Sequence, residues 1–176
     1  MSIGDRLDNE LRTIADFPKP GIMFKDITPV LENPELCKEL VEEMRARVSE
    51  LKIDAIAGVE SRGFLFGLPL AMAMNVPFIT IRKKGKLPYR TVSYSYDLEY
   101  GNATIEMHQD SIENGWNVLI HDDLLATGGT AAAAAELIKM EGGEIAGFSF
   151  LIGLTFLGGS ARLEEYCNQI MTIKDY

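Results

Sequence analysis

From residue 53 onward, short apolar runs alternate with segments that are long enough to form helices. The runs cover residues 53–59, 78–81, 118–120 and 145–152. Uninterrupted apolar runs are typical of strands that are buried on both faces of a parallel sheet. The pattern therefore predicts an α/β fold, and in such folds ligands bind beyond the carboxyl ends of the strands.

Between the second and third of these runs, the pattern changes to alternation. Residues 91–97 (TVSYSYD) and 102–108 (NATIEMH) alternate between apolar and polar side chains and flank Gly101. Alternation is typical of strands with one face in solvent, and a glycine between two such strands favours a tight turn. These residues therefore predict an antiparallel hairpin that leaves the parallel sheet.

The N-terminal part predicts two helices. In residues 3–15, apolar side chains at positions 3, 7, 11 and 14 share one helical face, and Ser2 is available as an N-cap. This helix is expected to end before residues 17–21 (FPKPG), because prolines and glycine prevent its continuation. A second helix is predicted to start at Asn33-Pro34, where a capping residue precedes proline. No repeat or linker interrupts the sequence, so we expect a single domain over residues 1–176.

Composition and charge exclude several classes of protein. The chain is 47% hydrophobic and 24% charged, which excludes disordered, collagen-like and low-complexity classes. Its 17 basic and 26 acidic side chains give a net charge of −9. Because a negative chain repels nucleic acids and anionic lipids, we expect no nucleic-acid partner and no membrane partner.

Three features favour a cytoplasmic protein. Cys37 and Cys167 lie far apart and form no CxxC pair, so neither a disulfide framework nor a zinc site is indicated. The first residues lack the basic and apolar regions of a signal peptide. The uncharged stretch at residues 145–161 contains four glycines. It is also shorter than the roughly 20 apolar residues that span a bilayer.

Residues 118–130 (VLIHDDLLATGGT) carry the most information about function. They read as a strand, two carboxylates and a glycine-rich turn that opens the helix-forming run AAAAAELIKM. At the start of a helix, residues 127–130 can offer backbone N–H groups and two hydroxyls to one anion. No lysine follows until Lys139, so this is not a Walker A loop, and a terminal monophosphate fits it better than a triphosphate. Asp122 and Asp123 would repel that phosphate and are expected to face hydroxyls of the molecule that carries it.

A simpler interpretation of these residues is a helix N-cap pair followed by a tight turn. For an isolated pair of glycines that interpretation would be favoured. It is disfavoured here, because an apolar run, two acids and the sequence TGGT precede the helix in this order.

Residues 58–64 (GVESRGF), after the first apolar run, could hold a nucleophile or an anion. A nucleophile elbow needs glycine two positions before the serine, but Val59 stands there before Ser61. The two histidines, His108 and His121, belong to no catalytic motif, so a serine hydrolase is disfavoured. Arg62 then reads either as an anion clamp or as an ordinary surface arginine.

Residues 82–90 (RKKGKLPYR) place five of the 17 basic side chains within nine positions, without an acid. Such a run is commonly a solvated face or a nucleic-acid patch. Here it follows a predicted buried strand in an acidic protein, which favours the capture of a small anion. The spacing does not divide the contacts among Arg82, Lys83, Lys84 and Lys86.

The motif at residues 118–130 resembles the ribose-phosphate signature of type I phosphoribosyltransferases, and its form LLATGGT is similar to that of the members that act on adenine. The resemblance continues in the same order from about residue 14 to about residue 155. It implies the parallel-sheet core of that family, with an N-terminal hood within about residues 1–34 and an antiparallel flexible loop at about residues 83–107. His121 departs from the family, which carries an aliphatic residue there, and we assign it a place in the core and no catalytic role.

The resemblance also implies the site residues. The flexible loop would bring Glu99, as the group that handles the purine proton or stabilises the ribosyl cation, and Tyr100, which would screen water. Substrate-binding roles would fall to residues of the hood, the ESRG segment, the basic run and the glycine-rich turn, namely Met23, Phe24, Lys25, Glu60, Ser61, Arg62, Lys83, Lys86, Asp122, Asp123, Ala126, Thr127, Gly128, Gly129 and Thr130. The family commonly has a cis peptide bond before the serine, so one is expected at Glu60–Ser61.

The activity implied is transfer of the phosphoribosyl group of 5-phosphoribosyl 1-diphosphate to adenine, which yields AMP and pyrophosphate. Magnesium would be held mainly by substrate oxygens and water, and a homodimer is expected. Two alternatives stay open: a phosphoribosyltransferase for another base, such as xanthine, and a regulatory module that senses the sugar diphosphate without catalysis. The second would usually carry a further nucleic-acid-binding domain.

Overall fold

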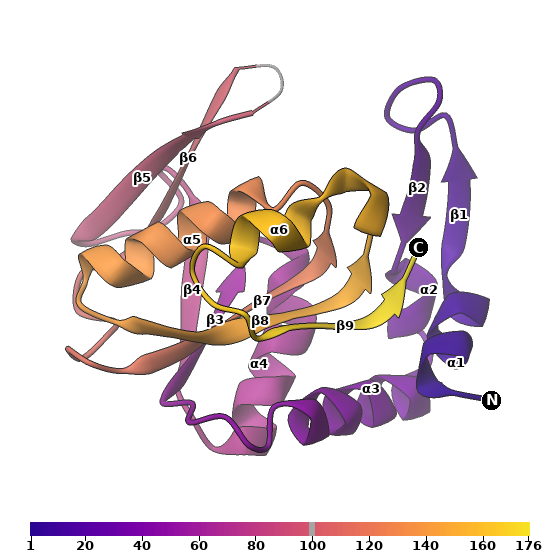
Figure 1. Ribbon diagram of the computed structural model, residues 1–176, viewed down its shortest axis with the longest axis horizontal. Helices are drawn as coiled ribbons and strands as arrows, with labels where there is room; N and C mark the ends of the chain where they lie inside the picture. Colours follow the sequence, from indigo (N-terminus) through magenta and orange to yellow (C-terminus); the bar gives the residue numbers. More distant parts are fainter. Residues whose placement is uncertain (99–100) are drawn as a thin grey trace.

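A computed structural model of the chain describes residues 1–98 and 101–176. Its centre is a seven-stranded sheet with the order β5-β6-β4-β3-β7-β8-β9 (Figure 1). Five strands run parallel: β3 (Ala55–Val59), β4 (Phe78–Lys83), β7 (Asn117–Leu125), β8 (Glu144–Gly153) and β9 (Ile170–Asp175). The predicted α/β fold with a parallel sheet is therefore confirmed.

The predicted antiparallel hairpin is also confirmed. It consists of β5 (Thr91–Asp97) and β6 (Asn102–His108), which pair over their whole length. Strand β6 joins the sheet by pairing antiparallel with the end of β4, where Lys83 faces Ile105. The hairpin projects beyond the sheet at one edge of the molecule (Figure 1).

Helices cover both faces of the sheet, because successive residues of its central strands point to opposite sides. In β3, Ala55 and Ala57 pack with the alanine-rich helix α5 (Gly129–Met140), whereas Ile56 packs with α3 (Pro34–Arg47) and α4 (Arg62–Met74). Small side chains in α5 let that helix lie close to the sheet. Short helices complete the layers: α2 (Thr28–Leu31), the 3-10 helix η1 (Thr155–Leu157) and α6 (Gly159–Leu163).

The N-terminal helix is shorter than predicted. Helix α1 covers Ile3–Glu10 and is capped by Ser2, whose hydroxyl accepts a hydrogen bond from the Asp5 N–H, as expected. The prediction was wrong beyond Glu10, since β1 (Arg12–Ala15) pairs antiparallel with β2 (Met23–Asp26). The β-branched Thr13 and Ile14 favour a strand, and the pairing supplies their backbone with partners.

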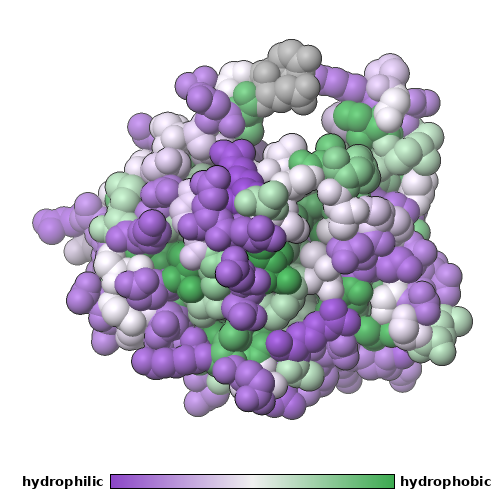
Figure 2. Space-filling view, viewed as in Figure 1, coloured by the Kyte–Doolittle hydropathy of each residue, from purple (hydrophilic) through white to green (hydrophobic). Residues whose placement is uncertain are grey.

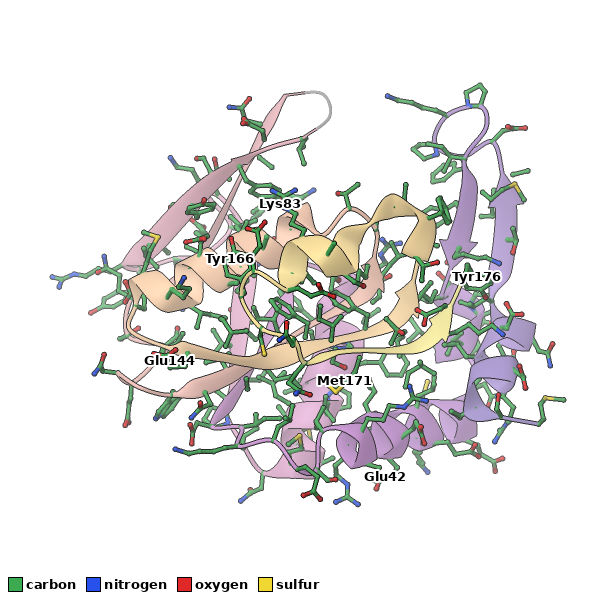
Figure 3. All side chains as sticks on the ribbon, viewed as in Figure 1. Glu42, Lys83, Glu144, Tyr166, Met171 and Tyr176 are labelled. Carbon is green, nitrogen blue, oxygen red and sulfur yellow. The ribbon has the colours of Figure 1, made fainter. Side chains whose placement is uncertain are left out.

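The predicted start of α3 is confirmed, since the Asn33 side chain accepts a hydrogen bond from the Leu36 N–H at 3.1 Å. Strand β9 was not predicted from the sequence. It pairs parallel with β8 and ends next to β2, where the ammonium of Lys25 lies 4.1 Å from the centre of the Tyr176 ring (Figure 3). None of the helices in the described ranges has the length and apolar character to span a bilayer.

Candidate active site

A cavity of about 720 Å³ lies at the carboxyl ends of β3, β4 and β7. This is the edge at which ligands were expected, and the surface is open there between the two hairpins (Figure 2). Ten of the residues to which the resemblance gives substrate-binding roles line this cavity: Glu60, Arg62, Lys83, Asp122, Asp123, Ala126, Thr127, Gly128, Gly129 and Thr130. Three segments that are far apart in the sequence, at residues 60–62, 83 and 122–130, thus meet at one site.

The glycine-rich turn forms the start of α5. Gly128 has a φ of +80°, and a Cβ atom there would lie 2.8 Å from the carbonyl oxygen of Gly159. Only glycine meets both requirements without strain. The following N–H groups and hydroxyls therefore stand at a helix N-terminus, where the helix dipole favours an anion.

The two acids of β7 have different environments, although they are adjacent. Burial raises the pKa of Asp122 well above its ordinary value, and the negative charge of Asp123 raises it further. Asp123 has its Oδ2 atom 3.0 Å from Nε of Arg62, in an ion pair that is not aligned as a hydrogen bond. The N–H of Asp123 donates to Oδ1 of Asp122 at 2.8 Å. Burial therefore favours the neutral form of Asp122, whereas Asp123 lies beside a cation.

Glu60 is bound to the basic run. Its Oε2 atom accepts hydrogen bonds from the Lys83 N–H at 2.8 Å and from Nε of Arg82 at 3.2 Å. Burial acts to raise the pKa of Glu60, but these hydrogen bonds together with the charges of Arg82 and Lys86 outweigh it and leave the pKa lowered. The Glu60–Ser61 peptide bond is cis, as the sequence resemblance implied. Ser61 itself is not among the residues that line the cavity.

The basic run reaches the cavity only in part. Arg82, Lys83 and Lys84 line it, whereas Lys86 does not. Lys86 is tied to this group through its carbonyl oxygen, which lies 3.4 Å from Nη1 of Arg82. In Figure 3, Lys83 lies between the β5–β6 hairpin and α5. Three cations of the run, Arg82, Lys83 and Lys84, therefore face the cavity directly.

The hood residues Met23, Phe24 and Lys25 lie on β2, outside the lining of the cavity. Phe24 is the link between them and the site, because the guanidinium carbon of Arg62 lies 5.4 Å from the centre of its ring. Lys25 points elsewhere and donates a hydrogen bond to Oγ1 of Thr13 at 3.0 Å. Phe24 therefore connects the hood to the cavity through Arg62.

The sequence did not single out Tyr96, which lines the cavity and lies with its hydroxyl 3.1 Å from Oγ1 of Thr130. The alternation in residues 91–97 could have shown which side chains share a face, but not which face meets the turn. Glu99 and Tyr100 lie outside the described residues, and their neighbours Leu98 and Asn102 line the cavity.

His121 is a core residue, as predicted, but its two ring nitrogens lack hydrogen-bond partners among the described residues. The side chain is fully buried, and neither ring nitrogen has a hydrogen-bond partner of ordinary geometry. Burial lowers the pKa of His121 to about 4, and a weak interaction with the Ser149 backbone offsets this only partly. No cluster of three His, Cys, Asp or Glu side chains that could hold a metal occurs among residues 1–98 and 101–176.

Comparison with known proteins identifies the family. A phosphoribosyl transferase domain matches residues 26–173. The adenine phosphoribosyltransferase of Cytophaga hutchinsonii is 53% identical over 170 residues, which are 97% of this chain and 94% of the relative. The crystal structure of the adenine phosphoribosyltransferase of Thermoanaerobacter pseudethanolicus superposes with a TM-score of 0.94 at 45% identity and covers 98% of this chain and 99% of its own.

A third similar structure, the enzyme of Saccharomyces cerevisiae in complex with adenine and an imino-altritol bisphosphate, has a TM-score of 0.89 at 38% identity. It covers 97% of this chain and 98% of its own. The family match, the sequence identity and the shared fold each extend over most of the chain. The protein therefore belongs to the adenine phosphoribosyltransferase family.

Proposed function

We propose that the protein transfers the phosphoribosyl group of 5-phosphoribosyl 1-diphosphate to N9 of adenine and releases AMP and pyrophosphate. One observation carries the proposal: an anion-binding helix start and a cluster of cations face the same cavity, with two acids between them. A sugar that carries phosphate at one end and diphosphate at the other has this sequence of charges. The similar yeast enzyme holds adenine together with a bisphosphate sugar mimic, which is consistent with the same substrates.

In this proposal the sugar is held by β7 and the turn that follows it. Residues 126–130 would bind the 5′-phosphate through backbone N–H groups and the hydroxyls of Thr127 and Thr130. Asp122 and Asp123 would bind the ribose hydroxyls through their carboxyl oxygens.

The diphosphate would be bound at the opposite end of the cavity. Arg62, Lys83 and Lys86 would stabilise the charge that develops on the leaving group, while Glu60 and Ser61 hold the segment before α4. Arg62 must then exchange its present partner, Asp123, for the diphosphate. At the same time, Asp123 would accept hydrogen bonds from ribose hydroxyls. Substrate binding would therefore replace the contact that Arg62 and Asp123 lose.

The base would be recognised by the hood. Phe24 would stack on adenine, and backbone groups near Met23 and Lys25 would read its edge. Glu99 would handle the purine proton or stabilise the ribosyl cation, and Tyr100 would keep water from it. Exclusion of water matters because a ribosyl cation is readily hydrolysed.

Magnesium fits this site as an ion that arrives with the diphosphate. Asp123 is paired with Arg62, Glu60 with Arg82, and the pKa of Asp122 is raised, so these carboxylates are poorly disposed to hold a free divalent cation. Substrate oxygens and water are the ligands that magnesium favours where phosphates are present. When bound, the ion would neutralise charge on the diphosphate. Residues 1–176 would act as one cytoplasmic domain, with the hood within about residues 1–34 and the flexible loop at about residues 83–107, and two copies would form a homodimer.

The test is an assay for the nucleoside monophosphate that forms from 5-phosphoribosyl 1-diphosphate with the purified protein, magnesium and one of four bases: adenine, which would give AMP, or hypoxanthine, guanine or xanthine, which would each give their own monophosphate. We expect turnover with adenine at least about a hundredfold above the others, because a site that hydrogen-bonds one base edge leaves its groups unpaired with another. Excess EDTA should abolish turnover without changing the melting temperature of the free protein. Preference for xanthine would favour the alternative enzyme. Binding of the sugar diphosphate without any AMP would favour the sensor.

A further inference from the structure

Glu106 is a buried carboxylate next to the basic run, and it has no part in the proposed reaction. It lies on β6 with only 4% of its surface exposed. Its Oε1 atom accepts two backbone hydrogen bonds, from Gly85 and from Leu87, each at 3.0 Å. Its Oε2 atom lies 3.5 Å from the hydroxyl of Thr91. A buried charge needs such partners, and here the backbone of the basic run supplies them.

These two hydrogen bonds fix the shape of the loop that carries the lysines. Gly85 has a φ of +87°, which lets the neighbouring N–H groups converge on one oxygen. Two further backbone hydrogen bonds complete the loop, from the Lys84 N–H to the Thr104 carbonyl at 3.0 Å and from the Lys86 N–H to the Lys83 carbonyl at 3.2 Å. The loop is thus wrapped around Glu106. Backbone N–H groups that converge in this way commonly bind anions, and here the protein's own carboxylate occupies them.

The charge of Glu106 also offsets repulsion among the cations. Arg82, Lys83, Lys84 and Lys86 are crowded into five positions, and like charges at such distances oppose one another. Lys83 and Lys84 line the cavity, whereas Glu106 does not. A negative charge behind the loop therefore stabilises it while its lysine side chains stay free to meet an anion in front.

We infer that Glu106 is a positioning residue for the diphosphate, which holds the loop of residues 83–87 so that its cations are in place before the substrate binds. This inference rests on the proposed function, because it takes the diphosphate as the anion that the loop binds. Binding to charges that are already in place costs less free energy than binding to charges that must first be brought together. Loss of Glu106 should therefore weaken binding of the sugar diphosphate and of pyrophosphate, but not binding of adenine.

The experiment compares E106Q and E106A with the wild type, and uses Glu113→Ala, at an exposed turn, as the matched control. E106A should raise the KM for 5-phosphoribosyl 1-diphosphate about tenfold, since it removes two hydrogen bonds to a charged acceptor. E106Q keeps an acceptor oxygen but loses the charge, and should fall between E106A and the wild type. The KM for adenine should stay within about twofold in both variants. The control should match the wild type in all of these values.

Two further measurements separate positioning from a general loss of structure. Calorimetry with pyrophosphate alone should show the same order of affinities without any catalysis. Gly85→Ala, which strains the loop at a positive φ but keeps the Glu106 side chain, should reproduce the split between the two KM values. Equal changes in both KM values, or an unchanged pyrophosphate affinity in E106A, would overturn the inference. If the wild type makes no AMP, the proposed function fails instead, and the calorimetry still tests the contact between the loop and pyrophosphate.

Discussion

His121 and Asp122 are neighbours in β7, and burial makes the neutral form of each more stable. The pKa of His121 is lowered to about 4 and that of Asp122 is raised, in both cases chiefly because the side chain is buried. They cannot neutralise each other as an ion pair, because successive side chains of a strand point to opposite faces. Asp122 lines the cavity, whereas His121 does not, and its ring lies against Gly67 in α4. Only Asp122 is therefore available to a substrate.

His121 should make the stability of the protein depend on pH. Its pKa is about 4 in the folded protein and 6.5 ordinarily, so the unfolded chain takes up a proton first as the pH falls. The contribution of the neutral ring is complete above pH 6.5 and is lost as the pH falls toward 4. This loss amounts to at most about 3 kcal/mol, from 1.36 kcal/mol per pKa unit. A His121→Val variant should lack this component.

The measurement is urea denaturation of the wild type and His121→Val at pH 7.5 and pH 4.5. The difference in unfolding free energy between the two pH values should be smaller in the variant by about 2 kcal/mol. His108→Gln, at a histidine that is not fully buried, serves as the control and should behave as the wild type. An equal loss of stability in the wild type and in His121→Val would contradict the assignment.

At the scale of elements, the parallel strands and the β5–β6 hairpin could be predicted because their signals are local. The apolar run at residues 53–59 and the alternation at residues 91–97 each fit a strand without reference to the rest of the chain. The helix predicted over residues 3–15 ended too late because Ile14 continues the helical period by coincidence. Its partner in the structure, Phe24, belongs to a strand that the sequence pattern did not indicate.

The candidate site divides in the same way. The turn at residues 127–130 could be recognised because strand, glycines and helix follow one another in the sequence. The contacts of Tyr96 with Thr130 and of Phe24 with Arg62 could not, since they join residues that are 34 and 38 positions apart, 96 to 130 and 24 to 62. Such contacts depend on how the sheet and the hairpins pack. No local pattern contains that information.

A substitution in the β1–β2 hairpin should affect the KM for adenine more than the KM for the sugar diphosphate. Phe24→Leu keeps apolar bulk but removes the ring that would stack on the base, so the KM for adenine should rise about tenfold. The KM for 5-phosphoribosyl 1-diphosphate should change by less than about twofold. The matched control is Ile22→Val, in the turn of the same hairpin. Steady-state kinetics with each substrate varied in turn measure both values, and equal rises would show that Phe24 does not act through the base.

At the scale of the whole molecule, the net charge conceals a separation of charge. The chain carries −9 in total, yet the run at residues 82–90 contains five cations and no acid. On α3, acids and bases instead pair with each other, as in the Arg47–Glu43 ion pair at 2.7 Å. The average charge argues against polyanionic partners, but it says nothing about a small anion that one loop could bind.

The exposed apolar face of α4 is where we expect the second copy of the homodimer. On α4, Leu65, Leu68 and Met72 share an exposed face, and their side chains are 43%, 47% and 73% exposed. The exposed Leu31 of α2 lies next to this face. Contiguous apolar surface of this kind marks an interface. Sedimentation of the wild type should give twice the chain mass of 19.5 kDa, and Leu68→Glu should give a monomer. Met140→Glu, at an exposed apolar residue of α5, should stay dimeric, and a dimeric Leu68→Glu variant would place the interface elsewhere.

The contacts between α1 and β9 have a consequence for the order of events during synthesis. The ammonium of Lys174 lies 3.5 Å from Oδ1 of Asp5, and the Tyr176 hydroxyl donates a hydrogen bond to Asp8. Helix α1 precedes the sheet in the sequence and leaves the ribosome before it. Strand β9, which contacts α1, leaves only after the other strands of the sheet. Until residues 170–176 have left the exit tunnel, a nascent chain can form the turn at residues 127–130 while α1 still lacks these contacts.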